Sequence, residues 1–291
     1  MTLPPFEYLA PASVEELVGL LARHGTKARI LAGGTDLINL MADRAVRPEY
    51  VIDLNGVPQL AGISYEPGKG LTIGAATKIE AIEKSPLIRE KYFSLHQAAA
   101  QIGSPQVRAM ASIGGNSCNA SPCADMPPPL VTLGALVRLV GPRGRREMLL
   151  EDFILGNRRT ALEADELLQS LFVPEPWPRS ACRYATIGLR EAQEIDIASV
   201  AVNLALKPET GEVAAVRIAM GAVAPVPMRA RKAEEILLGR RPTEEVLQEA
   251  AGSCGAECSP IDDLRASAAY RRHVVRVLAA RVLRETLSAI G

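Results

Sequence analysis

The residues best suited to chemistry stand in two stretches that each carry a pair of adjacent glycines. The first is Leu31-Ala32-Gly33-Gly34-Thr35-Asp36-Leu37, and the second runs from Ala111 to Asp125 and contains Gly114 and Gly115. Paired glycines let the backbone take positive φ and approach a ligand closely, because no Cβ stands in the way. Successive backbone N–H groups in such a loop bind anions, and pyrophosphate is the ligand that this pattern favours. An ordinary surface loop can have the same composition, so either stretch alone fits both interpretations.

The second stretch also carries small polar side chains and a single carboxylate. We expect a loop here, in which Asp125 supplies the carboxylate and prolines 127–129 stiffen the exit by fixing φ. The small donors and acceptors are Ser112, Asn116, Ser117, Asn119 and Ser121.

A small mixed α/β unit is expected to position the first stretch. Ser13 and Glu16 form a capping-box pattern for a helix over 13–25, and short strands are predicted at 28–31 and 50–54. A second helix is expected to begin near Asp36, so that a strand, a Gly-Gly turn and a helix N-terminus follow one another and present N–H groups to an anion. The glycine spacing is neither the G-x-G-x-x-G dinucleotide fingerprint nor a phosphate-binding P-loop with its lysine.

A sheet-rich α+β unit is expected to position the second stretch. Hairpins are predicted for 61–65 with 71–75 and for 135–140 with 145–149, and a strand is predicted at 166–173, where Pro174 ends it. Thr77 and Glu80 form a second capping-box pattern. An alanine-rich helix over 95–102 should end at Gly103, shortly before the second stretch.

The proline cluster at 174–178 marks a domain boundary, after which two long strands and three helices are predicted. The strands span about 197–206 and 212–220, and the helices lie near 229–238, 243–254 and 267–288. In the last helix an apolar face is predicted at Val274, Val277, Leu278, Val282 and Leu283. Arginines 271, 272, 276, 281 and 284 are expected on its solvated face, a subunit contact being the alternative.

Composition restricts the class of protein. The chain has 291 residues, 48% of them hydrophobic and 23% charged, with zero net charge, so no nucleic-acid-binding surface is indicated. It shows no apolar run of about 20 residues and no secretion signal. Its five cysteines are an odd number, which does not suit a framework of disulfide bonds. We therefore expect a cytoplasmic protein with free thiols and no transmembrane segment.

Other candidate side chains are better explained by structure than by chemistry. Cys118 and Cys123 flank the second stretch, but an iron–sulfur cluster usually needs four thiolates, so we expect small buried thiols and no metal site. The histidines at 24, 96 and 273 are isolated, which favours surface or packing roles. Asp36 and Asp53 could serve as catalytic acids, but helix capping and turn formation explain both. No catalytic residue is assigned.

The two stretches in this order resemble those of a known family, the FAD-binding (medium) subunits of the molybdenum hydroxylases. This group includes carbon monoxide dehydrogenase, xanthine dehydrogenase and 4-hydroxybenzoyl-CoA reductase. The resemblance covers essentially the whole chain, since segments 102–108, 165–168 and 262–272 are also similar to the family.

The resemblance implies an α+β fold of the vanillyl-alcohol-oxidase (PCMH) type, with two subdomains that clasp FAD and a C-terminal domain with a small antiparallel sheet and helices. The corresponding ranges are 1–56, 57–176 and 177–291. Asp125 would accept a hydrogen bond from a ribityl or ribose hydroxyl group, and Ile102 and Leu168 would touch the cofactor. Tyr184, Ile187 and Arg190 would approach the isoalloxazine ring, and Ala185 stands where some relatives have a lysine. The diphosphate would be held through backbone N–H groups of Ile30, Leu31, Ala32, Gly33, Gly34, Thr35, Asp36 and Leu37 and of Ser112, Ile113, Gly114, Gly115 and Asn116.

The resemblance also implies partners. A large subunit would carry molybdopterin and a small subunit two [2Fe–2S] clusters, in a dimer of heterotrimers. FAD would relay electrons between the clusters and NAD, a quinone or ferredoxin. The alternatives are a stand-alone FAD-dependent oxidoreductase that acts on a small substrate and a flavin-binding protein without turnover. The sequence assigns neither the substrate, the electron acceptor nor the direction of electron flow.

Overall fold

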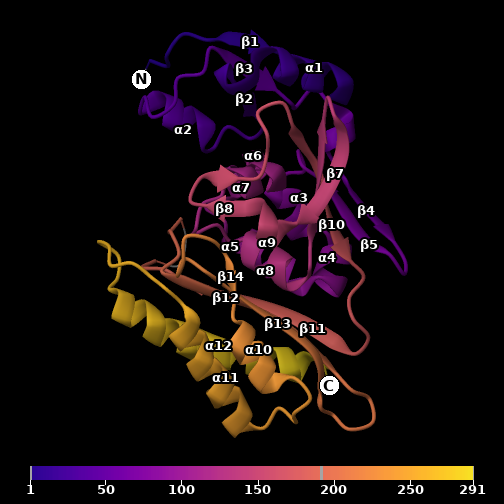
Figure 1. The fold of residues 1–291 in the computed structure, drawn as a ribbon, viewed down its shortest axis with the longest axis vertical. Coiled ribbons are helices and arrows are strands. Elements are labelled where there is room, and N and C mark those ends of the chain that lie inside the picture. The colour runs from indigo at the N-terminus through magenta and orange to yellow at the C-terminus, as the bar shows by residue number, and fades with distance from the viewer. Residues whose placement is uncertain (1, 191–192, 291) are drawn as a thin grey trace.

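The computed structural model describes residues 2–190 and 193–290, which form three structural units in a row along the long axis of the molecule (Figure 1). A small N-terminal unit lies at one end. A five-stranded sheet and its helices occupy the middle, and a four-stranded sheet backed by helices lies at the other end. No helix in the described part of the chain is long and apolar enough to cross a membrane.

The N-terminal unit is a three-stranded parallel sheet in the order β1-β3-β2. The predicted helix and both predicted strands are present, whereas β1 was not predicted. In α1 the N-cap Ser13 hydroxyl accepts a hydrogen bond from the Glu16 N–H, as in a capping box, but the Glu16 carboxylate accepts its bond from the N–H of Ala12, one residue before the N-cap. The elements are β1 (Glu7–Leu9), α1 (Val14–His24), the 3-10 turn η1 (Gly25–Lys27), β2 (Ala28–Leu31), α2 (Leu37–Ala42), β3 (Tyr50–Asp53) and the 3-10 turn η2 (Pro58–Leu60).

The middle unit is an antiparallel sheet in the order β4-β5-β10-β6-β7. Both predicted hairpins are confirmed, and so is the predicted strand, although Pro174 still pairs with Gly70 as its last residue. The strands are β4 (Ile63–Glu66), β5 (Gly70–Gly74), β6 (Leu136–Gly141), β7 (Gly144–Leu149) and β10 (Leu167–Pro174); β8 (Ile154–Gly156) and β9 (Arg159–Thr160) form a separate small hairpin.

Helices cover one face of this sheet. Leu71, Ile73 and Leu171 point from the strands into a core that the helices complete. The capping box predicted at Thr77 is wrong, because the Thr77 hydroxyl instead exchanges hydrogen bonds with the backbone of Gly62. The helices are α3 (Ile79–Lys84), α4 (Pro86–Lys91), α5 (Phe93–Gln101), α6 (Pro105–Met110), α7 (Ile113–Asn119), α8 (Pro127–Thr132) and α9 (Leu150–Phe153).

The C-terminal unit is an antiparallel sheet in the order β11-β12-β13-β14 with helices on one face. The two predicted long strands are β12 and β13, and β11 pairs along the full edge of β12 without having been predicted. The elements are β11 (Ser180–Ile187), β12 (Ala198–Leu206), β13 (Val213–Gly221), β14 (Met228–Arg229), α10 (Arg231–Leu237), α11 (Glu244–Glu257) and α12 (Ala268–Ile290).

Helix α12 corrects two predictions about its faces. Arg271 is only 2% exposed, and its guanidinium donates to the carbonyls of Ile197 and Ala222 and to the Asp263 carboxylate. Val277 is 51% exposed, and Val275 takes its place in the core. Arg271 and Val275 are four residues apart, so they lie on the same side of the helix. The buried face therefore begins at Arg271, one turn before Val274, where the predicted apolar face begins.

Each unit has its own cluster of buried apolar side chains, but the clusters cross the predicted boundaries. Leu60 and Leu167 belong to the N-terminal cluster, and Tyr184 and Ala201 of the C-terminal sheet pack into the middle cluster. The three units therefore share buried contacts, and the division at 56 and 176 stays a prediction.

Candidate functional site

The fold brings the two Gly-Gly stretches into contact with each other. A Cβ atom on Gly33 would lie 2.1 Å from the carbonyl oxygen of Met110, and one on Gly115 would lie 3.9 Å from the Cβ of Ala32. The side-chain amide of Asn119 also donates a 3.0 Å hydrogen bond to the Asp36 carboxylate. Residues about 80 positions apart in the chain thus form one site, and only glycine fits at 33 because a side chain there would overlap the facing backbone.

The first stretch connects the end of β2 to the start of α2. Gly34 has a φ of 74°, which an L-residue with a side chain adopts only with strain. None of the backbone N–H groups of residues 32–36 donates a hydrogen bond within the part of the chain that the structure describes. This row of free donors at a turn between a strand and a helix forms an arrangement suited to anion binding.

The second stretch departs from the predicted loop, because residues 113–119 form helix α7. Ser112 is its N-cap and accepts a 3.1 Å hydrogen bond from the Gly115 N–H. The N–H groups of Ile113, Gly114 and Asn116 donate to the carbonyls of Thr77, Ala75 and Ser112. These N–H groups are therefore already bonded within the chain, and their role toward a diphosphate stays a prediction.

Close packing explains the glycine at 114. A Cβ there would lie 2.6 Å from the Cβ of Ala75, so Gly114 lets α7 approach the end of β5. Two polar atoms on the same helix remain available, since Asn116 Oδ1 and Ser117 Oγ are buried and lack a partner within the described chain. Such buried orphan atoms require an explanation, and a bound ligand would supply one. Prolines 127–129 likewise do not stiffen a loop but open helix α8.

Two residues that sequence reasoning missed hold the stretches together. The Asn55 amide donates a 2.8 Å hydrogen bond to the carbonyl of Ala32, and the Lys78 ammonium donates to Asn55 Oδ1 at 3.0 Å and to the Met110 carbonyl at 3.1 Å. Burial lowers the pKa of Lys78. Asn55 precedes a glycine directly after a predicted strand, and this turn signal was present in the sequence. No comparable signal indicated Lys78.

Asp125 lies in a buried acidic cluster with Tyr184 and Asp196. The Tyr184 hydroxyl lies 2.9 Å from Asp125 Oδ1 and 3.2 Å from Asp196 Oδ2, so it links the two carboxyl groups. Burial raises the pKa of Asp125 to about 6, and burial together with the charge of Asp125 raises that of Asp196 well above its usual range. The two carboxyl groups therefore titrate as a coupled pair, and burial makes both harder to ionise than an exposed aspartate.

The remaining predicted site residues are brought together only in part. Ile102 and Leu168 both lie in the middle core, the side on which α7 packs. On β11 the side chains alternate, so Tyr184 points to the middle unit, whereas Ala185 and Ile187 pack on the C-terminal core. Arg190 pairs with Glu194 at 2.9 Å. The side chain of Ala185 therefore does not join the cluster around Asp125.

The structure also places the other side chains that the sequence offered as candidates. The described residues contain no group of three or more His, Cys, Asp or Glu side chains that could hold a metal ion. Burial raises the pKa of Cys118 to about 12, as expected for an inert thiol. Asp53 accepts a hydrogen bond from the Asn55 N–H, which is the predicted turn. Asp36 occupies the N-cap position of α2 but bonds Asn119 instead of capping the helix, and burial raises its pKa.

Comparisons with known proteins identify the class to which this fold and site belong. Residues 4–176 match the FAD binding domain in molybdopterin dehydrogenase, and residues 183–286 match the CO dehydrogenase flavoprotein C-terminal domain. The chain therefore carries an FAD-binding domain of the PCMH type followed by this C-terminal domain.

Individual relatives agree over the full length. The chain is 35% identical over 283 residues to a carbon monoxide dehydrogenase medium chain from Hydrogenophaga pseudoflava, covering 97% of each chain. It is 32% identical to a glyceraldehyde dehydrogenase medium chain from Sulfolobus acidocaldarius, covering 97% of this chain and 98% of the relative. A solved structure of carbon monoxide dehydrogenase from Hydrogenophaga pseudoflava matches with a TM-score of 0.94 at 36% identity and covers 100% of this chain and 99% of its own. The chain belongs to the family of FAD-binding medium subunits of molybdenum hydroxylases.

Proposed function

We propose that this chain is the electron-relay subunit of a heteromeric molybdenum hydroxylase and that its FAD lies across the two Gly-Gly stretches. The observation that supports this most directly is the contact between Gly33 and Met110, which joins the free N–H groups of residues 32–36 to the start of α7. The residues fit the cofactor, because this surface offers backbone donors to a diphosphate and has no side chain at its closest point.

Each part of the site has a distinct proposed role toward FAD. The N–H groups of residues 32–36 hold the diphosphate, and buried Asn116 and Ser117 offer polar atoms that lack a partner within the described chain. Asp125 accepts a hydrogen bond from a sugar or ribityl hydroxyl group. Ile102 and Leu168 supply an apolar surface for the ring system. FAD, when bound, accepts or gives electrons singly or in pairs, and the protein supplies orientation and shielding.

The partners belong to the same proposal. Members of this family work with a subunit that carries molybdopterin and a subunit that carries [2Fe–2S] clusters, and we expect both here, in a dimer of heterotrimers. The substrate then reacts on the large subunit, and this chain passes electrons between the clusters and an outside acceptor or donor such as NAD, a quinone or ferredoxin. The match of the whole chain to the FAD-binding domain and to the flavoprotein C-terminal domain supports this division of roles.

Purification of the tagged chain from its native host tests the proposal. We expect two partner chains to co-purify with it, in a three-chain complex that contains flavin, molybdenum and iron. A Gly33→Val chain should purify in the same complex with molybdenum and iron but without flavin, because the added side chain overlaps Met110. A solitary chain that holds flavin and turns over a small substrate would instead establish the stand-alone oxidoreductase. A Gly33→Val complex with its full flavin content would place FAD elsewhere.

A further inference from the structure

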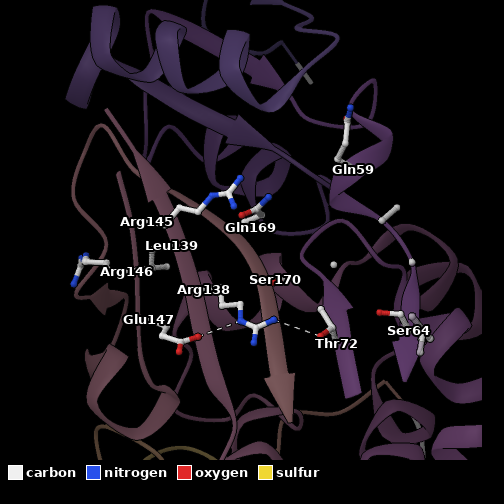
Figure 2. Close-up of a pocket in the computed structure, with 14 residues that line it drawn as sticks. Gln59, Ser64, Thr72, Arg138, Leu139, Arg145, Arg146, Glu147, Gln169 and Ser170 are labelled. Carbon is white, nitrogen blue, oxygen red and sulfur yellow. Dashed lines mark hydrogen bonds and ion pairs between the residues drawn. The ribbon is translucent and has the colours of Figure 1, made fainter. Parts of the chain in front are cut away.

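A cavity of about 780 Å³ opens on the face of the five-stranded sheet that the helices leave uncovered (Figure 2). None of the residues that line it is a predicted FAD residue. On β5 the lining residues Thr72 and Gly74 alternate with the core residues Leu71 and Ile73. Its floor consists of small side chains on three neighbouring strands, namely Gly62, Ser64, Thr72, Gly74 and Ser170. Small residues leave the backbone of the strands uncovered, and this run of small residues therefore accounts for the hollow in the sheet surface.

A bulge in β10 directs one amide into this cavity. The pairing of β10 with β6 shifts between Leu168 and Ser170, so Gln169 is the extra residue. Leu168 remains in the core, whereas Gln169 lines the cavity. Bulges are enriched next to functional sites because they re-aim a side chain in this way.

Three long polar side chains at the upper rim have no partner. The side chains of Arg145, Gln169 and Gln59 make no hydrogen bond or ion pair with other parts of the chain that the structure describes, although all three line the cavity. In Figure 2 the guanidinium group of Arg145 points toward the amide of Gln169. The Arg145 guanidinium and the Gln169 amide therefore lie together at one end of the cavity, whereas Gln59 stands apart from them (Figure 2).

The charges along the wall favour an anion. Arg138 donates hydrogen bonds to Glu147 at 3.1 Å and to Thr72 at 3.5 Å, and its guanidinium lies over the ring of Phe172. The negative charge of Glu147, which also lines the cavity, is therefore already neutralised by Arg138. Arg146 makes two hydrogen bonds with Glu166, at 2.8 and 2.7 Å. Arg145 is therefore the cation of the wall that is left without a carboxylate.

We propose that this cavity is a second ligand site, separate from the FAD cradle, which binds a small anionic molecule through a phosphate or carboxylate group. The Arg145 guanidinium takes the anionic group in a bidentate fashion, and the amide of Gln169 donates to it. The hydroxyls of Ser64, Thr72 and Ser170 line the part of the cavity that would hold the rest of the ligand. The volume falls in the range of about 300–1,000 Å³ that is typical of small-molecule pockets.

Isothermal titration of the FAD-saturated protein with phosphate, AMP and citrate tests the proposal, because bound FAD blocks binding of these anions at the cofactor site. We expect saturable binding of at least one of the probes. The Arg145→Ala substitution should weaken it by about tenfold or more, since a charged hydrogen-bonding partner is lost. Arg23→Ala is the matched control, because Arg23 is an exposed arginine on α1, away from the cavity, and its removal changes the net charge equally.

The probes distinguish the source of the anionic group. Binding of phosphate and AMP without citrate identifies a phosphorylated ligand, and the reverse identifies a carboxylic acid; either result supports the site if Arg145→Ala abolishes it. Absence of saturable binding at millimolar concentrations of all three probes would overturn the proposal. An equal loss of affinity in Arg145→Ala and Arg23→Ala would also overturn it, because it would show a general charge effect.

Discussion

Replacing Asp125 by asparagine should remove a large part of the pH dependence of stability. Asparagine keeps the size of the side chain and an oxygen that accepts from the Tyr184 hydroxyl, but it cannot ionise. Asp125 titrates with a pKa of about 6 in the folded chain, because burial disfavours its charged form, against an ordinary value of 3.8. Since one pH unit corresponds to about 1.4 kcal/mol, this difference amounts to about 3 kcal/mol.

The sign follows from proton binding. The folded chain holds the Asp125 proton more tightly than the unfolded chain, so stability from this group is highest below about pH 4 and is lost as the pH rises through about 6. The native chain should therefore lose about 2.5 kcal/mol more than Asp125→Asn between pH 4 and pH 7, since a small part of the effect is already lost at pH 4. The charge of Asp125 also raises the pKa of Asp196, so this second carboxyl should ionise more easily in the variant.

Urea denaturation of the FAD-free chain at a series of pH values measures this difference. The exposed carboxylate Asp152 is outside the cluster, so Asp152→Asn is the matched control and should follow the native curve. Parallel stability curves for the native chain and Asp125→Asn would refute the reasoning, because they would show that the carboxyl titrates alike in the folded and unfolded states.

Three further predictions concern packing and reactivity. Gly33→Ala should weaken FAD binding by about tenfold or more in a fluorescence titration, because its Cβ meets the Met110 carbonyl. Gly19→Ala, at an exposed position of α1, should instead raise stability by about 0.5–1 kcal/mol. Arg271→Met should lower the free energy of unfolding by about 3 kcal/mol, because two carbonyls and a carboxylate lose their buried donor, whereas the exposed Arg272→Ala should stay within about 0.5 kcal/mol. Cys118, whose pKa burial raises to about 12, should resist iodoacetamide at pH 8 until urea unfolds the chain, as peptide mass spectrometry would show.

The sequence predicted local elements well because their signals are local. The capping box at Ser13, the hairpins of the middle unit and the helices of the C-terminal unit follow from spacing within one segment. Strands β1 and β11 were missed because their stability comes from pairing with β3 and β12, which local propensity does not report.

The sequence indicated which two stretches form the candidate site, but not the local structure of the second stretch. The two Gly-Gly stretches were paired correctly, as the contact between Gly33 and Met110 confirms. The second stretch is a capped helix, because Ser112 satisfies the Gly115 N–H, and the glycine at 114 serves packing against Ala75. Lys78, Asp196 and the burial of Arg271 depend on contacts between distant segments, so no pattern in the sequence indicated them.

The flavin content of the purified chain tests the central claim most directly. After saturation with FAD and removal of the excess, absorption and protein assays should give one FAD per native chain, and far less than one for Gly33→Val at the same concentration. Circular dichroism of both proteins establishes that the variant is folded. A native chain that retains no FAD, or a folded Gly33→Val chain that retains a full equivalent, would contradict the assignment of the cofactor to the junction of the two Gly-Gly stretches.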